Sequence, residues 1–188
     1  MSDDALGDRG KALENAFFKA EELKRFEKLK ENANRTNKIE NLQKASGIKN
    51  TELLGHLLDL KLDADTMAAV SLVPLIHVAW ADGDVDELEK DAILKSASEK
   101  GVEKSTEAYQ LLGSWLNKEP GDIFSIWKEY VTELISDWNA SKKEELGRDV
   151  LLRAKEVAEA AGGLLGIGAT SKEEAQALSE IKNVFGIE

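Results

Sequence analysis

Apolar residues at helical spacing are the feature of this sequence that most restricts its fold. From Ile123 to Trp138 they recur at alternating steps of three and one residues, which places them on one broad face of a helix. The chain contains only 2 prolines among 188 residues, so long segments are free to be helical. No segment has the strict apolar–polar alternation that is typical of a half-buried strand. These patterns predict an all-α protein.

Seven helical segments are expected after Asn50, and most of them begin at a residue that commonly caps helices. The expected capping starts are Asn50 or Thr51, Asp63 or Asp65, Asp86, Ser105, Ser141 and Ser171. The last two, like Asp86, have a glutamate three residues later, as in a capping box. Pro74 lies within the second segment and is expected to bend it. The sequence therefore predicts a seven-helix bundle over residues 50–188.

Residues 1–46 have a different pattern and are expected to form a charged helical extension of this bundle. Within residues 6–35, apolar side chains recur at steps of three or four but make only a thin stripe. A second, short helix is expected from Thr36 or Asn37 to a stop at Gly47. So narrow a stripe cannot be buried on all sides, and the helix is therefore either solvated or bound to a protein partner. Three aromatic residues favour the partner: Phe17, Phe18 and Phe26.

The charge balance restricts the partners of the protein. The formal net charge is −11, which repels nucleic acid and anionic lipid and attracts cations and basic proteins. No apolar run reaches the length of a membrane span, and the N-terminus is too charged for a signal peptide. The absence of cysteine excludes thiol catalysis, disulfides and most structural zinc sites. We expect a cytoplasmic protein that binds neither nucleic acid nor membrane, and the sequence carries no signal for an oligomeric state.

Alternating carboxylates make the loop from Asp82 onward the main candidate site. Asp82, Asp84 and Asp86 supply hard oxygen ligands of the kind that Ca²⁺ or Mg²⁺ prefers, and Glu89 follows one helical turn later. A simpler interpretation is a helix start, in which Asp86 caps the helix and Glu89 favours its positive end. The helix start explains those two residues but leaves Asp82 and Asp84 without a role. Both interpretations remain open, with all four acids as candidate metal ligands.

An EF-hand is excluded at this loop. With Asp82 as the first position, the sixth position is Glu87, where glycine is needed for the sharp turn. The twelfth position is Ile93, where the bidentate glutamate belongs. Any cation site here is therefore of another kind.

No other constellation of residues predicts catalysis. His56 and His77 are expected to be packed histidines, and there is no nucleophile motif for a catalytic triad. Acid–base work by a pair of carboxylates is compatible with so many acids, but nothing singles out one pair. The glycines at 162, 163, 166 and 168 fit an interhelical turn, and the tryptophans at 80, 115, 127 and 138 fit core positions. We expect a non-enzymatic protein without an organic cofactor.

The stretch from Val78 to Glu89, VAWADGDVDELE, resembles the A-x-ADG-x-(V/I)-x-x-x-E signature of TerB-like domains, the tellurite-resistance family. Residues 162–186 are similar to the closing segment of that family, a small-residue turn before a capped acidic helix. The resemblance covers about residues 50–188. It implies a bacterial cytoplasmic helical bundle that acts in tellurite resistance or a general stress response, without established catalysis. It also implies Asp82, Asp86 and Glu89 as metal ligands, with Asp84 nearby.

The N-terminal segment ALGDRGKALENAFFKAEELKRF is similar to the opening of the alphaproteobacterial zeta-type inhibitor of ATP synthase. This second resemblance implies a different function, in which the N-terminal helix engages and inhibits a larger ATPase. The partner would then be bound through residues 6–35.

Overall fold

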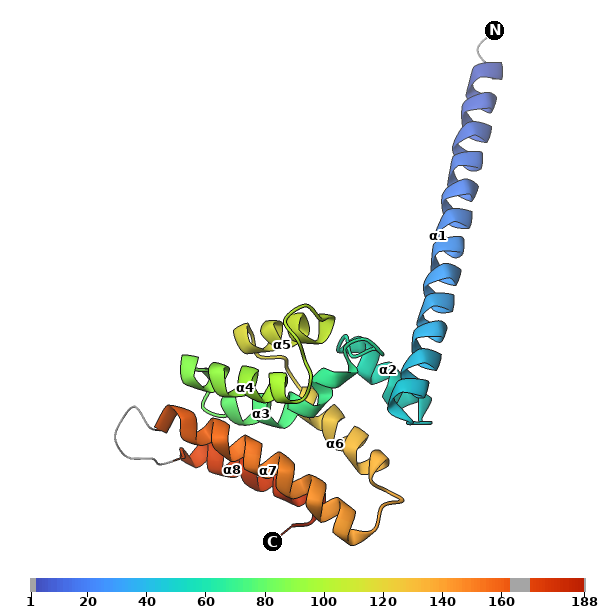
Figure 1. The fold of residues 1–188 in the computed structure, drawn as a ribbon. Helices are drawn as coiled ribbons and strands as arrows, with labels where there is room; N and C mark the ends of the chain where they lie inside the picture. The colour runs from blue at the N-terminus through green and yellow to red at the C-terminus, as the bar shows by residue number, and fades with distance from the viewer. Residues whose placement is uncertain (1–2, 163–169, 188) are drawn as a thin grey trace.

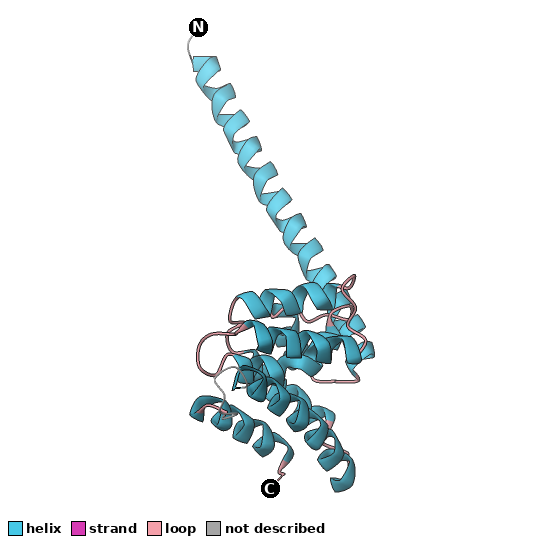
Figure 2. Ribbon diagram, turned by 60° about the vertical axis from the view of Figure 1, so that its left-hand side comes forward, coloured by secondary structure: helices cyan, strands magenta, loops and turns pink. Residues whose placement is uncertain are grey.

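The computed structural model of the protein describes the backbone of residues 3–162 and 170–187, and the side chains of residues 21–160 and 170–187. Within these ranges helices are joined by turns and loops and there is no strand, which confirms the all-α prediction (Figure 2). The elements in chain order are α1 (Asp3–Ser46), α2 (Thr51–Asp59), the 3₁₀ helix η1 (Met67–Leu72), α3 (Val73–Ala79), α4 (Glu87–Glu99), α5 (Glu107–Asn117), α6 (Ile123–Leu134), α7 (Ala140–Gly162) and α8 (Lys172–Phe185).

The helices α2 to α8 correspond to the seven expected segments, with one addition. The second segment is divided into η1 and α3, and Pro74 lies in the first turn of α3. Proline is well tolerated there because its missing N–H would have no partner within the helix. Pro74 therefore marks a change from 3₁₀ to α geometry, where a bend within one helix had been expected.

Local capping explains where several helices begin. The side chain of Asn50 accepts hydrogen bonds from the backbone N–H groups of the first turn of α2, as predicted. The expected capping boxes at the starts of α4 and α8 are both formed. The box expected at Ser141 is not formed, because α7 begins at Ala140 and Oδ1 of Asn139 accepts the Lys142 N–H at 2.9 Å. Sequence spacing found the correct region and misplaced the cap by two residues.

The helix α1 is continuous, so the predicted break near Thr36 is wrong. It ends where expected, because Gly47 has a φ of +75°, a left-handed conformation suited to glycine. Two ion pairs join this helix to the bundle. Arg35 lies 2.7 Å from Asp59, and Lys38 lies 3.0 Å from Asp63.

The two ends of α1 have different environments. Near its C-terminal end, Leu42 is fully buried in the core. The N-terminal part of α1 projects away from the bundle (Figure 1). The last turns of this helix are therefore a part of the bundle, and the first turns are not.

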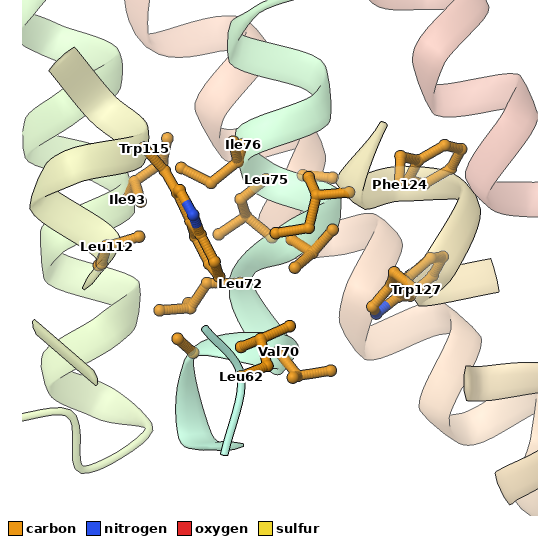
Figure 3. Close-up of a cluster of buried hydrophobic side chains, with 14 of the residues drawn as sticks. Leu62, Val70, Leu72, Leu75, Ile76, Ile93, Leu112, Trp115, Phe124 and Trp127 are labelled. Atoms are coloured by element: carbon orange, nitrogen blue, oxygen red, sulfur yellow. The ribbon is translucent and has the colours of Figure 1, made fainter. Parts of the chain in front are cut away.

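The core is organised around α3, a short helix with almost every side chain buried. Figure 3 shows how side chains from η1, α4, α5 and α6 surround it. Trp115 and Trp127 are buried in this core, and Trp80 and Trp138 are half-buried against it, in agreement with the prediction for the tryptophans. The helices α7 and α8 lie side by side against α3 and close one side of the bundle (Figure 1).

Candidate cation site at the turn between α3 and α4

The acidic turn joins α3 to α4 and is anchored in the core at both ends. At its start, Nε1–H of Trp80 donates a 2.8 Å hydrogen bond to the carbonyl oxygen of Trp115 on α5. Gly83 closes the turn through a 3.0 Å hydrogen bond from its N–H to the carbonyl of Trp80, with a φ of +94°. At the other end, the side chain of Val85 is buried. The turn is therefore held in place, while the side chains between the anchors face solvent.

Asp82 and Asp84 are exposed, and each makes one local hydrogen bond. Oδ1 of Asp82 accepts the N–H of Asp84 at 3.3 Å, and Oδ1 of Asp84 accepts the N–H of Val85 at 3.0 Å. Aspartate often stabilises turns in this way. These bonds use only one oxygen of each carboxylate.

Asp86 and Glu89 form the capping box at the start of α4. Oδ1 of Asp86 accepts the N–H groups of Leu88 and Glu89 at 2.7 and 2.9 Å. In return, Oε2 of Glu89 accepts the N–H of Asp86 at 2.9 Å. The helix-start interpretation of these two residues is therefore confirmed, and binding of a cation remains a separate prediction.

Glu89 is an unusual member of a capping box because its side chain is only 4% exposed. The pKa of Glu89 is raised from 4.5 to about 7, mainly by burial. The hydrogen bond from the Asp86 backbone opposes this increase, and the negative charges of Asp86, Glu174 and Asp82 contribute to it. The Glu89 carboxyl is thus close to half-ionised near neutral pH.

Glu174 is the residue of this site that sequence reasoning missed. It belongs to the capping box of α8, where its Oε2 accepts the N–H of Ser171, and its side chain is also buried. Its charge is close enough to contribute to the raised pKa of Glu89. The helix α8 begins on the same side of the bundle as the acidic turn (Figure 1).

A signal for Glu174 was present in the sequence. Gly83, Asp86 and Glu89 repeat as Gly168, Ser171 and Glu174 at a constant offset, although Gly168 lies outside the described residues. This repeat indicated two similar turns but gave no reason to expect them to be neighbours.

The ion pair formed by Lys90 near this site involves Glu87 and none of the four candidate ligands. Lys90 lies at 2.7 Å from Glu87, and this pairing raises the pKa of Lys90, with smaller contributions from the charges of Asp84 and Asp86. Among the ion pairs of the described residues, none involves the four acids that the sequence singled out. None of the four acids therefore forms an ion pair with a lysine or arginine of the described residues, and Lys90 acts on Asp84 and Asp86 only through its charge at longer range.

The four acids have the chemistry of divalent-cation ligands, but their side chains are not arranged around a common point in this structure. Each retains one carboxylate oxygen without a hydrogen bond to the described residues, and carboxylate oxygens suit Ca²⁺ or Mg²⁺. In the part of the chain that the structure describes, however, no three His, Cys, Asp or Glu side chains are grouped so that they could hold a metal ion. Binding of a cation would thus require the exposed Asp82 and Asp84 side chains to turn toward Glu89.

The two histidines lie apart from this chemistry. The ring of His77 stacks on Phe124 at 3.7 Å, and its Nε2 lies 3.0 Å from Oε2 of Glu180. Burial lowers the pKa of His77, against the opposing effect of Glu180. His77 is therefore a packed histidine, as predicted, whereas the prediction that His56 is packed is wrong because His56 is exposed.

Comparisons of the chain with protein-family models, with curated proteins and with solved structures gave no match. Within the described residues, every helix is too short or too polar to cross a membrane. The fold and the site thus define a helical bundle with a buried acid at a polar turn.

Proposed function

We propose that this protein is a non-enzymatic binding protein that takes up a divalent cation, Ca²⁺ or Mg²⁺, at the acidic turn and acts through protein partners. The candidate ligands are Asp82, Asp84, Asp86 and Glu89. The observation that carries the proposal is the buried Glu89 carboxyl, which has three other acids near it and no basic partner among the described residues. A bound cation would offset this concentration of negative charge.

The arrangement separates the ligands into a fixed pair and a movable pair. Asp86 and Glu89 are held by the capping box, so their remaining oxygens have a defined position. Asp82 and Asp84 are exposed and can reorient at little cost. Flexible oxygen ligands are better suited to Ca²⁺ than to Mg²⁺, which requires near-ideal octahedral geometry. We therefore expect Ca²⁺ to bind more tightly.

The biological setting follows from the resemblance of VAWADGDVDELE to the TerB-like signature. We propose a role in tellurite resistance or a general stress response in a bacterial cytoplasm. In this role the cation changes the charge and the rigidity of the turn, and a protein partner recognises the changed surface.

Calorimetric titration with CaCl₂ and MgCl₂ at pH 6.5 tests the cation site. Because the pKa of Glu89 is raised to about 7, cation binding should release a proton from a part of the molecules. The observed heat should therefore differ between buffers of different ionisation enthalpy. The double variant Asp82→Asn, Asp84→Asn should lose the binding, whereas Asp137→Asn, which changes an exposed acid of the α6–α7 turn, should retain it.

Two calorimetric outcomes would contradict the cation site. One is the absence of heat up to millimolar cation. The other is equal binding to the double variant and to wild type.

A second candidate function is inhibition of an ATPase through α1. Three large apolar side chains of the projecting part are exposed, namely Leu23 at 61%, Phe26 at 68% and Leu29 at 68%. They are three residues apart and thus lie toward one side of the helix. An exposed apolar stripe on a helix is suited to docking into a groove of a partner.

Truncation tests the role of α1 only if the core is left intact. Removing residues 1–46 would delete Leu42 from the core, so a truncation of residues 1–30 is preferable. A second variant replaces Leu23, Phe26 and Leu29 by glutamine, which retains helix propensity. If α1 is the inhibitory element, both variants should lose inhibition of a purified bacterial F₁-ATPase while cation binding persists. No inhibition by the wild-type protein would eliminate this candidate.

A further inference from the structure

A mostly apolar pocket of about 260 Å³ lies between η1, α6, α7 and α8. It shares no lining residue with the acidic turn, so it can be tested independently of the proposed function. Its volume is a little below the range of roughly 300–1,000 Å³ that is typical of small-molecule sites. The pocket can thus accept only a small ligand.

Aromatic rings form the apolar part of this pocket. Trp127 and Phe185 are buried and pack edge to face, with ring centroids 6.1 Å apart. Tyr130 lies three residues after Trp127 on α6 and also lines the pocket. Its hydroxyl makes no hydrogen bond to any described residue, and burial raises the pKa of the phenol. A ligand would therefore meet flat apolar surfaces together with the hydroxyls of Tyr130 and Ser71.

A basic pair lies at the lining of the same pocket. Lys100 Nζ is 2.9 Å from Asp149 Oδ2, and Arg153 Nε is 3.2 Å from Asp149 Oδ1. Nη1 of Arg153 is held by Glu99 at 2.9 Å and by Ser96 at 3.2 Å. The guanidinium is thus fixed in position, and its Nη2 donors make no hydrogen bond to the described residues.

The charged groups at this end of the pocket balance one another. Lys100 and Arg153 carry two positive charges, and Asp149 on the lining and Glu99 beside it carry two negative charges. Nη2 of Arg153 keeps N–H donors that no described residue accepts, and charged donors make strong hydrogen bonds to a carboxylate. A ligand with an apolar body and a carboxylate head would match this lining.

We propose that this pocket binds a small amphipathic carboxylate of the size of a medium-chain fatty acid. The carboxylate accepts hydrogen bonds from Nη2 of Arg153 and from Lys100. The hydrocarbon chain lies against Trp127, Tyr130 and Phe185. An uncharged or positively charged molecule with the same chain lacks the interaction with the basic pair and binds more weakly.

Titration of the full-length ¹⁵N-labelled protein with octanoate, followed by NMR, tests this inference. The expected result is a saturable set of shifts in η1, α6 and the middle of α7, including the indole resonance of Trp127. Octanol and octylammonium are matched probes that differ only in the charge of the head group. They should bind at least about tenfold more weakly, as expected for the loss of a charge-assisted hydrogen bond.

Two variants separate the head-group site from the chain site. Lys100→Gln should weaken octanoate binding about tenfold and leave octanol binding unchanged. Lys95→Gln, which changes an exposed lysine of α4 outside the pocket, should change neither. Ala68→Trp, which adds a large side chain to the lining, should weaken all three probes.

The proposal is overturned by any of three results. The first is that octanoate produces no saturable shifts up to millimolar concentration. The second is that octanol or octylammonium binds as tightly as octanoate. The third is that the shifts map to the exposed apolar residues of α1 instead of the pocket.

Discussion

The indole N–H of Trp80 donates a 2.8 Å hydrogen bond to the backbone carbonyl of Trp115, and this bond joins the end of α3 to α5. Trp80 is also the C-cap residue of α3. Its backbone carbonyl accepts the hydrogen bond from the N–H of Gly83 that closes the acidic turn. The bond therefore connects the core to the residues that we propose as a cation site.

Trp80→Phe should destabilise the protein by about 1–3 kcal/mol, because the carbonyl of Trp115 loses its partner in a half-buried environment. The measurement is urea unfolding followed by circular dichroism. Trp138→Phe is the matched control, since the Trp138 ring is half-buried, its indole N–H makes no hydrogen bond to the described residues, and phenylalanine keeps an aromatic face for Lys142, whose Nζ lies 3.8 Å from the ring centroid. Equal loss in the two variants would show that ring size matters and the hydrogen bond does not.

Glu89→Gln should make the protein more stable at pH 8 and leave its stability unchanged at pH 4. The folded state holds the Glu89 proton more tightly than the unfolded state, because the pKa is raised from 4.5 to about 7. The stability linked to this proton is thus complete below the unfolded pKa and is lost as the pH rises through 7. The gain at pH 8 should be on the order of 1–3 kcal/mol.

Thermal unfolding at a series of pH values measures this gain. The expected shift in Tm is about 2–4 °C for each kcal/mol. Glu87→Gln, which removes the exposed first acid of α4 and its ion pair with Lys90, is the control and should not gain stability at pH 8. If Glu89→Gln is less stable than wild type at pH 8, the ionised Glu89 carboxylate does not destabilise the folded protein.

His77 should affect the pH dependence in the opposite direction at lower pH. Burial depresses its pKa below 6.5, so its contribution to stability is present above 6.5 and is lost as the pH falls through the lowered pKa. His77→Phe should therefore flatten the decline of Tm on the acid side. If the wild type and His77→Phe decline equally below pH 6, the imidazole is not desolvated in the folded state.

Two helical glycines should respond to alanine with opposite signs. At Gly147 of α7, an added Cβ would come within 2.7 Å of Cγ and 2.8 Å of Cβ of Phe185, so the packing of α7 on α8 would have to shift. Gly147→Ala should destabilise the protein by about 1–3 kcal/mol. At Gly113 of α5, a Cβ would meet nothing within 4 Å, and alanine should stabilise the helix by up to about 1 kcal/mol. Chemical unfolding of both variants checks the pair.

Features that depend on near neighbours in the chain could be predicted from the sequence. The capping boxes at Asp86 and Ser171 were found because each needs only a glutamate three residues later. The stop of α1 at Gly47 likewise follows from one residue type in one conformation. Helix periodicity gave the segments from α2 to α8 for the same reason.

Features that depend on distant residues could not be predicted. The continuity of α1 past Arg35 is supported by ion pairs with Asp59 and Asp63, which no local pattern reveals. The acid Glu174 is 85 positions after Glu89, and only the packing of the bundle brings its charge near. Lys100 and Arg153 at the aromatic pocket come from the end of α4 and from α7, and no local pattern in the sequence predicted that they lie together.

The most direct test is an NMR titration of the Glu89 side-chain carboxyl carbon between pH 4 and 9, without and with saturating Ca²⁺. We predict a pKa near 7 without the cation and a clearly lower value with it, because bound Ca²⁺ stabilises the ionised carboxylate. A pKa near 4.5 in the free protein, or a value that Ca²⁺ leaves unchanged, would contradict the proposed cation site.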